Sequence, residues 1–185
     1  MVAPPVNRSF VWTLAAVAGI GYLCAMVVSG ALPELRNRVK FEAKGVMTVA
    51  PERIDRIQIE RGPARVALAR TGSGGWSREG GDALPVPLAA QVSLAVQYMH
   101  TAAPVRAIDA EEIRGIAPAE FGLAPPALSV TLSAGPQPVL QARFGARNAE
   151  DLLQYMTLAG QEGLYLMSRF VGQQWDTAID AIERR

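Results

Sequence analysis

Near its amino end the chain carries ~23 consecutive residues without a charged side chain, from Phe10 to Leu32. As an α-helix rising ~1.5 Å per residue, this run would measure ~35 Å, whereas the hydrocarbon core of a bilayer is ~30 Å thick. No other feature restricts the fold as strongly, because a buried core helix of this length is rare in so small a protein. The run therefore predicts one transmembrane helix over residues 10–32.

Two alternatives to a retained anchor stay open, a cleaved signal peptide and a buried core helix. A signal peptide has an apolar run of ~7–15 residues and a small-x-small cleavage site. This run is longer, and Ser29-Gly30-Ala31 matches such a site only weakly. Trp12 lies near the amino end of the run, where an amphipathic ring suits the membrane–water interface. These observations favour the anchor.

Small residues recur at helical spacing within the run. Ala15 and Gly19 are four residues apart, and so are Gly21 and Ala25. Small residues at this spacing let two membrane helices approach closely, although glycine and alanine are common in membrane helices in any case. We predict a possible helix–helix contact through these four residues.

The only cysteine of the chain, Cys24, also lies in the run. A lone cysteine excludes an intramolecular disulfide and a cysteine metal cluster. A lipoprotein acylation site would have small residues directly before the cysteine, whereas Tyr22 and Leu23 precede it here. We interpret Cys24 as a small apolar residue, and we predict no metal, no cofactor and no catalytic residue.

The remaining sequence divides the chain into four segments. A short tail occupies residues 1–9, the predicted membrane helix 10–32, a polar and basic juxtamembrane connector 33–52, and a soluble domain 53–185. About 150 residues beyond the apolar run are enough for one domain with its own core.

The distribution of charge argues against nucleic acid as a partner, and it does not decide on which side of the membrane the soluble domain lies. Residues 41–185 hold 14 basic and 16 acidic side chains, so no basic face is implied and nucleic acid is not a predicted partner. A count of positive charges beside the run, dominated by Arg36, Arg38 and Lys40, would place the domain in the cytoplasm. That rule weakens for long translocated domains, so the residues alone do not decide the side.

Short alternating segments in the first half of the domain predict strands. Ile57 and Ile59 alternate with polar residues, and Val66 and Leu68 continue the pattern after a turn. Trp76 is predicted to begin a third strand. A helix then follows two prolines that suit a first turn, and it ends before Pro104. Its apolar residues at helical spacing include Leu88, Val92, Ala95 and Met99.

The second half repeats the order of strands and then a helix. Alternation predicts strands over 128–133 and 140–144, with Gly145 ending the latter, and a further pair over 154–158 and 164–167. Ser168 is a candidate cap for a final helix that includes Trp175. The order indicates an α+β fold, a transmembrane helix followed by a mostly antiparallel sheet with packed helices.

Several of these segments carry short motifs. A strand pair leads to Trp76, and a helix leads to the corner Phe121-Gly122-Leu123-Ala124-Pro125-Pro126. A strand ends at Phe144-Gly145, and the next strand pair has Tyr155 in one arm and Tyr165 in the other.

In these motifs the chain resembles a bacterial family of unknown function. Its members occur beside ABC-type transporter genes related to gliding-motility auxiliary proteins, and they often begin with a membrane helix. The resemblance covers residues 53–175, with Phe121 where the family usually has tyrosine. It supplies no catalytic residues. It implies a single-pass protein of the bacterial inner membrane, with its soluble domain in the periplasm and serving a membrane complex.

No group of residues has the spacing of a known catalytic or ligand site. The only histidine, His100, lies near a predicted helix end without a recognisable acid or nucleophile partner. The acidic residues Asp109, Glu111 and Glu112 lack the alternating ligands of a calcium loop. Residues 72–75 are glycine-rich, but no Lys-Ser/Thr follows as in a phosphate loop.

We therefore expect a protein that is not an enzyme, a membrane accessory or structural subunit that docks its soluble domain on a larger complex. Membrane lipids and other membrane-protein subunits are the expected partners. The alternative is a small-molecule or lipid-binding auxiliary component of an ABC-type transport system, since a sheet with a packed helix can enclose an apolar cavity.

Overall fold

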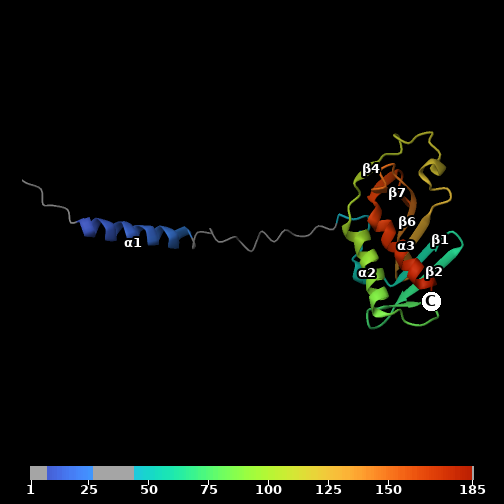
Figure 1. The fold of residues 1–185 in the computed structure, drawn as a ribbon, viewed down its shortest axis with the longest axis horizontal. Helices are drawn as coiled ribbons and strands as arrows, with labels where there is room; N and C mark the ends of the chain where they lie inside the picture. Colours follow the sequence, from blue (N-terminus) through green and yellow to red (C-terminus); the bar gives the residue numbers. More distant parts are fainter. Residues whose placement is uncertain (1–7, 27–43, 185) are drawn as a thin grey trace, which may run out of the picture. The chain divides into compact units, whose positions relative to one another are not determined.

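The computed structural model describes residues 8–26 and 44–184, and the side chains of residues 12–26 and 44–184. The chain divides into two units, Met1–Glu42 and Ala43–Arg185 (Figure 1). The first unit contains helix α1 (Arg8–Met26), and the second contains a sheet with helices packed on it.

The prediction of a transmembrane helix over 10–32 is wrong. Among the described residues, none of the helices is both long enough and apolar enough to cross a bilayer. Helix α1 has 19 residues and begins at the charged Arg8. Residues 27–32 of the predicted span lie outside the described residues, and the cellular location stays a prediction.

The small residues predicted to make a helix–helix contact all lie on α1. Ala15, Gly19, Gly21 and Ala25 are exposed. A Cβ atom added at Gly19 or Gly21 would meet no atom within 4 Å, so both positions leave room for a close neighbour. The contact itself stays a prediction.

The second unit is built on one eight-stranded sheet. Its strand order is β3-β2-β1-β5-β6-β7-β8-β4, and every neighbouring pair is antiparallel. The strands are β1 (Arg56–Arg61), β2 (Ala64–Arg70), β3 (Trp76–Arg78), β4 (Arg106–Ile108), β5 (Leu128–Ala134), β6 (Gln137–Arg147), β7 (Leu153–Leu158) and β8 (Leu164–Ser168).

The alternation seen in the sequence sets which face of the sheet is buried. In the register, Ile59 lies opposite Val66 of β2 and Val130 of β5, so three β-branched side chains meet on one face. All three are buried, while the residues between them are more exposed. Such cross-strand contacts stabilise an antiparallel sheet with one buried face.

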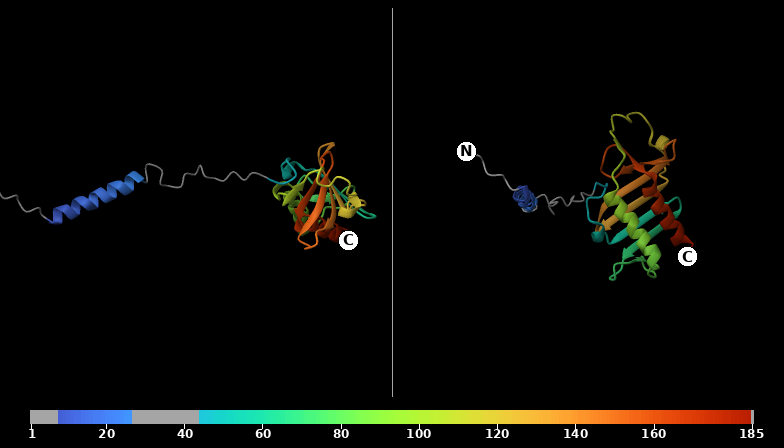
Figure 2. Two further views of the ribbon diagram at one scale, coloured as in Figure 1. Left: turned by 90° about the horizontal axis from the view of Figure 1, so that it is seen from above. Right: turned by 60° about the vertical axis from the view of Figure 1, so that its left-hand side comes forward.

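Two helices cover that face, α2 (Val86–Thr101) and α3 (Arg169–Glu183) (Figures 1 and 2). Their inward residues meet the buried sheet residues in one core. Ser168 is the N-cap of α3 as predicted, but its side chain makes no capping hydrogen bond. The largest fully buried side chains include Trp76, Trp175, Phe144, Met47, Ile54, Ile57, Ile59, Leu68, Met99, Leu128, Leu132 and Met156.

The prediction that a strand ends at Gly145 is wrong, because β6 continues to Arg147 with a register shift after Phe144. A Cβ atom on Gly145 would lie 2.2 Å from the carbonyl oxygen of Phe121. The glycine therefore lets the corner at 121–126 lie directly on the strand. The ring of Phe121 also contacts that of Tyr155, with centroids 5.1 Å apart. Motifs far apart in the sequence thus meet at one place in the fold.

Candidate docking face on helix α2

Helix α2 has no Asp, Glu, Lys or Arg in its 16 positions, and its only basic residue is His100 in the last turn. One side of it faces the core through Leu88, Val92, Ala95, Val96 and Met99. A surface helix normally carries charged residues on its other side, where they are solvated. On α2 that other side carries no Asp, Glu, Lys or Arg.

The outer side of α2 exposes apolar residues one helical turn apart. Val86 is 83% exposed, Ala90 is exposed, and Leu94 is 39% exposed. Residues four apart lie above one another on a helix, so the three side chains form a continuous strip. We call the surface of Val86, Ala90 and Leu94 the α2 face. Beside it, the ring of Tyr98 contacts exposed Phe170 of α3 at a centroid distance of 5.0 Å.

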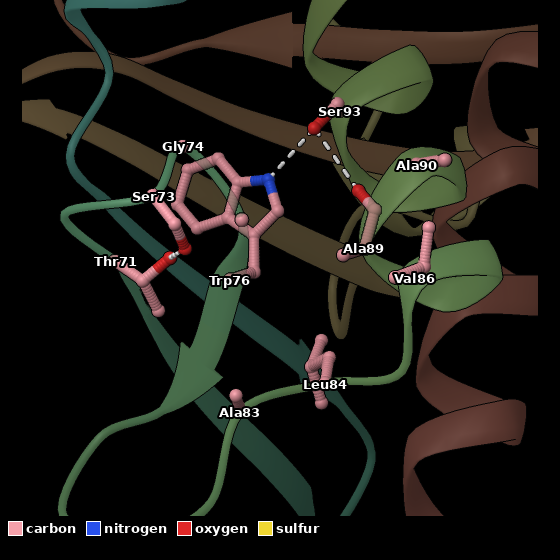
Figure 3. A pocket seen from close by; sticks show the side chains of 11 residues that line it. Thr71, Ser73, Gly74, Trp76, Ala83, Leu84, Val86, Ala89, Ala90 and Ser93 are labelled. Carbon is pink, nitrogen blue, oxygen red and sulfur yellow. Dashed lines mark hydrogen bonds between the residues drawn. The ribbon is translucent and has the colours of Figure 1, made fainter.

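A surface pocket of about 480 Å³ adjoins the α2 face. Figure 3 shows Val86, Ala89, Ala90 and Ser93 of α2 on one side of it, opposite the loop that joins β2 to β3. The pocket exists because its walls carry small side chains and glycines at 74 and 75. Its lining is mainly apolar, with hydroxyl groups from three residues.

Two half-buried hydrogen bonds hold the pocket wall. The indole nitrogen Nε1 of Trp76 donates to the hydroxyl of Ser93 over 2.9 Å, and that hydroxyl donates to the carbonyl oxygen of Ala89 over 3.0 Å (Figure 3). The Arg70 guanidinium lies 4.5 Å from the Trp76 ring centroid and donates through Nε to the Ile54 carbonyl oxygen over 2.6 Å. The indole is thereby oriented and packed, because a buried N–H needs an acceptor.

Helix α3 provides the contrast within the same layer. One flank of α3, next to β1, carries Asp176, Asp180 and Glu183, all of which pair with Arg61. The shortest distance joins Arg61 Nη2 and Asp180 Oδ1, at 2.5 Å. Burial raises the pKa of Asp176 above its ordinary range, while Arg61 opposes the rise. The acidic residues of α3 are thus paired with the sheet. For the side chains of the α2 face, no hydrogen bond or ion pair is seen among the described residues.

The sheet face opposite the helices is polar and open. Hollows of about 240 Å³ and 320 Å³ on it share Thr131 and are lined mostly by charged, hydroxyl and amide residues, with some apolar ones. A solvated face of an antiparallel sheet has this composition. The polar sheet face is therefore a weaker candidate for a binding site than the α2 face.

The candidates singled out in the sequence lie apart from one another. His100 is half-buried near the end of α2, with Nδ1 2.8 Å from the Met47 carbonyl oxygen. Glu112 pairs with Arg106, and Glu111 pairs with Arg114. The glycine-rich residues 72–75 follow β2, and residues 73–75 line the pocket. Within the part of the chain described, no three His, Cys, Asp or Glu side chains are grouped so that they could hold a metal ion.

The sequence analysis missed the α2 face, although a signal for it exists. Residues 83–105 contain no Asp, Glu, Lys or Arg. A helix at the surface of a small domain cannot bury all its sides, so a charge-free helix of this length indicates an apolar exposed face.

No protein family model matches this chain, and neither a curated protein nor a solved structure is similar to it. The resemblance to a bacterial family of unknown function stays a prediction.

Proposed function

We propose that the unit Ala43–Arg185 is a non-catalytic docking domain that binds a partner protein through the α2 face. The partner surface is apolar and uncharged, to match the face. The observation that carries this proposal is the exposure of Val86 and Leu94 on a helix without charges. Protein interfaces have cores depleted of charged side chains, and contiguous exposed apolar surface marks such sites.

A second candidate function is the binding of a small apolar molecule. The pocket beside α2 has a volume of about 480 Å³, within the range of ligand pockets, and its mostly apolar lining carries a few hydroxyl groups. In this case the ligand would lie against Ala89, Ala90 and Ser93. This pocket supports the alternative prediction, in which the protein is a small-molecule or lipid-binding auxiliary component of a transport system.

A matched pair of charge insertions tests the docking function. Leu94→Glu adds a charge to the α2 face, and Leu152→Glu adds the same charge at another leucine, which is 63% exposed near the start of β7. The full chain is extracted at its native expression level, and the mass of the assembly is measured for both variants and the original chain. Circular dichroism confirms that each variant is folded.

We expect the original chain and the Leu152→Glu variant to migrate in an assembly larger than one chain. Leu94→Glu should release most of the protein as a single chain, because a buried unpaired carboxylate is costly. A lone monomer for the original chain, or equal assembly for both variants, would show that the α2 face is not a docking surface.

The remaining expectations stay predictions. They are the absence of enzymatic activity, the absence of nucleic-acid binding, and partners among membrane lipids and membrane-protein subunits.

A further inference from the structure

We infer that the pocket beside the α2 face takes an uncharged small molecule with a compact apolar body and a hydroxyl group at one end. This inference rests on the second candidate function and names the class of its ligand. It is argued from the charge of the lining, from the hydroxyl groups that stay open to a ligand, and from the side of the pocket on which those groups lie.

The lining of the pocket is neutral. Among the residues that the structure describes, none with a charged side chain lines it. The Arg70 guanidinium lies over the ring of Trp76 but is not part of the lining. Its Nε and Nη2 atoms donate to the carbonyl oxygens of Ile54 and Pro51, over 2.6 and 2.9 Å. A charged ligand would lose hydration in the pocket and gain no opposite charge, so the lining favours an uncharged ligand.

The hydroxyl groups that stay open to a ligand lie on the loop between β2 and β3. Thr71 Oγ1 and Ser73 Oγ are 3.0 Å apart and share one hydrogen bond. One hydroxyl proton of this pair and several lone pairs therefore remain available. The Ser93 hydroxyl, in contrast, already accepts from the Trp76 indole and donates to the Ala89 carbonyl oxygen. A ligand hydroxyl can both donate and accept, which suits the Thr71–Ser73 pair.

The side of the pocket opposite this loop is apolar. It is formed by α2 and the residues just before it, and the apolar lining residues there are Ala83, Leu84, Val86, Ala89 and Ala90. Three of these five are alanines, which leave room for an apolar body. Figure 3 shows Thr71 and Ser73 on the loop and Val86, Ala89 and Ala90 on the helix. A ligand thus meets hydroxyl groups at one end and apolar surface at the other.

Equilibrium dialysis of the full chain against three related probes tests the class of ligand. Naphthol has an apolar body and one hydroxyl group, naphthalene lacks the hydroxyl group, and naphthoate carries a carboxylate in its place. We expect naphthol to bind at least about fivefold more tightly than either of the others, because one net hydrogen bond is worth about that factor and an unpaired charge costs more.

Three variants locate the binding. Ala83→Trp fills the pocket without changing the α2 face, and its control Ala110→Trp adds the same side chain at an exposed alanine in the turn after β4. Thr71→Val combined with Ser73→Ala removes the hydroxyl pair. We expect Ala83→Trp to abolish the binding of naphthol and Ala110→Trp to leave it unchanged. The double variant should bind naphthol no better than naphthalene. Circular dichroism confirms that each variant is folded.

The outcomes separate this inference from the functions proposed above. Binding of naphthoate as tight as that of naphthol would overturn the inference and leave a small-molecule site in place. Absence of binding by every probe, or equal binding to Ala83→Trp and the original chain, would overturn the inference together with the second candidate function. Protein docking would survive either result, because the Leu94→Glu and Leu152→Glu variants test it separately.

Discussion

The backbone nitrogen of Gly45 donates a hydrogen bond of 2.9 Å to the carbonyl oxygen of His100, in the last turn of α2. Met47 donates in the same way to Met99 over 2.9 Å, and His100 Nδ1 lies 2.8 Å from the Met47 carbonyl oxygen. The last carbonyl groups of a helix lack partners within it, so this segment supplies them. Gly45 and Met47 come from the stretch predicted as a connector, yet they belong to the folded unit and hold one end of the helix that carries the α2 face.

Gly45→Ala should destabilise the second unit. A Cβ atom at Gly45 would lie 2.3 Å from the carbonyl carbon of His100, so the segment must move and its hydrogen bonds weaken. We expect a loss of about 2–4 kcal/mol in the free energy of unfolding, measured by urea denaturation. The control is Gly72→Ala, where nothing lies within 4 Å, and its change should stay within about 0.5 kcal/mol. Equal effects of the two substitutions would refute the role of this close approach.

Ser93→Ala should destabilise the wall of the pocket beside the α2 face. It removes the acceptor of the Trp76 indole N–H, and Trp76 is fully buried. A buried donor left without a partner costs about 1–3 kcal/mol, which denaturant unfolding can resolve. Ser73→Ala, at an exposed position in the neighbouring loop, is the control and should cost much less. If both variants unfold at the same denaturant concentration, the indole hydrogen bond contributes little.

Asp151 should stabilise the fold above acidic pH. A hydrogen bond from Arg147 Nη1 at 3.1 Å, together with the charge of Arg169, holds the pKa of Asp151 below its ordinary range. Its contribution is therefore present above the unfolded pKa of ~3.9 and is lost as the pH falls through the lower folded pKa. Asp151→Asn suits the test, because asparagine tolerates the positive φ of 56° at this position.

The Asp151→Asn variant should unfold at a lower urea concentration than the original chain at pH 7. The difference should shrink as the pH falls below ~4, because the original carboxylate is then protonated too. A difference that does not depend on pH would mean that the side chain acts through its shape and not through its charge.

Asp176 should affect the pH dependence of stability in the opposite direction to Asp151. Burial raises the pKa of this carboxyl, and its ion-pair partner Arg61 lies 3.8 Å away through Nη1. The contribution of Asp176 to stability is therefore greatest below the unfolded pKa of ~3.9 and is lost as the pH rises through the higher folded pKa. Asp176→Asn should be at least as stable as the original chain at pH 7, and any advantage should vanish at pH 3. Urea unfolding at both pH values measures this, and a variant that is less stable only at pH 7 would reverse the assignment.

The local sequence pattern was sufficient to predict most strands and helices of the second unit. Alternation predicted the β1–β2 hairpin, because Ile57, Ile59, Val66 and Leu68 mark one face with a period of two. Elements held by distant contacts were not predictable in this way. Strand β4 has three exposed or half-exposed residues and exists through its pairing with β8. Strand β6 extends past Gly145 because the corner at 121–126 packs on it, a contact between residues more than twenty positions apart.

The membrane helix was predicted from the composition of 10–32 alone. Among the described residues, no helix is both long enough and apolar enough to cross a bilayer, and α1 is described from Arg8 to Met26. The absence of charged residues from a run does not by itself show that the run forms a membrane-spanning helix.

For the candidate site, the sequence by itself determined that residues 83–105 are uncharged and that a helix forms there. It did not determine which side of that helix is covered, because apolar residues lie all around it. The tertiary structure decided this by placing the sheet against Leu88, Val92 and Met99 and leaving Val86 and Leu94 outside. The physical reason is that hydrophobic burial has no direction of its own, so the shape of the neighbouring elements selects which apolar surface stays open.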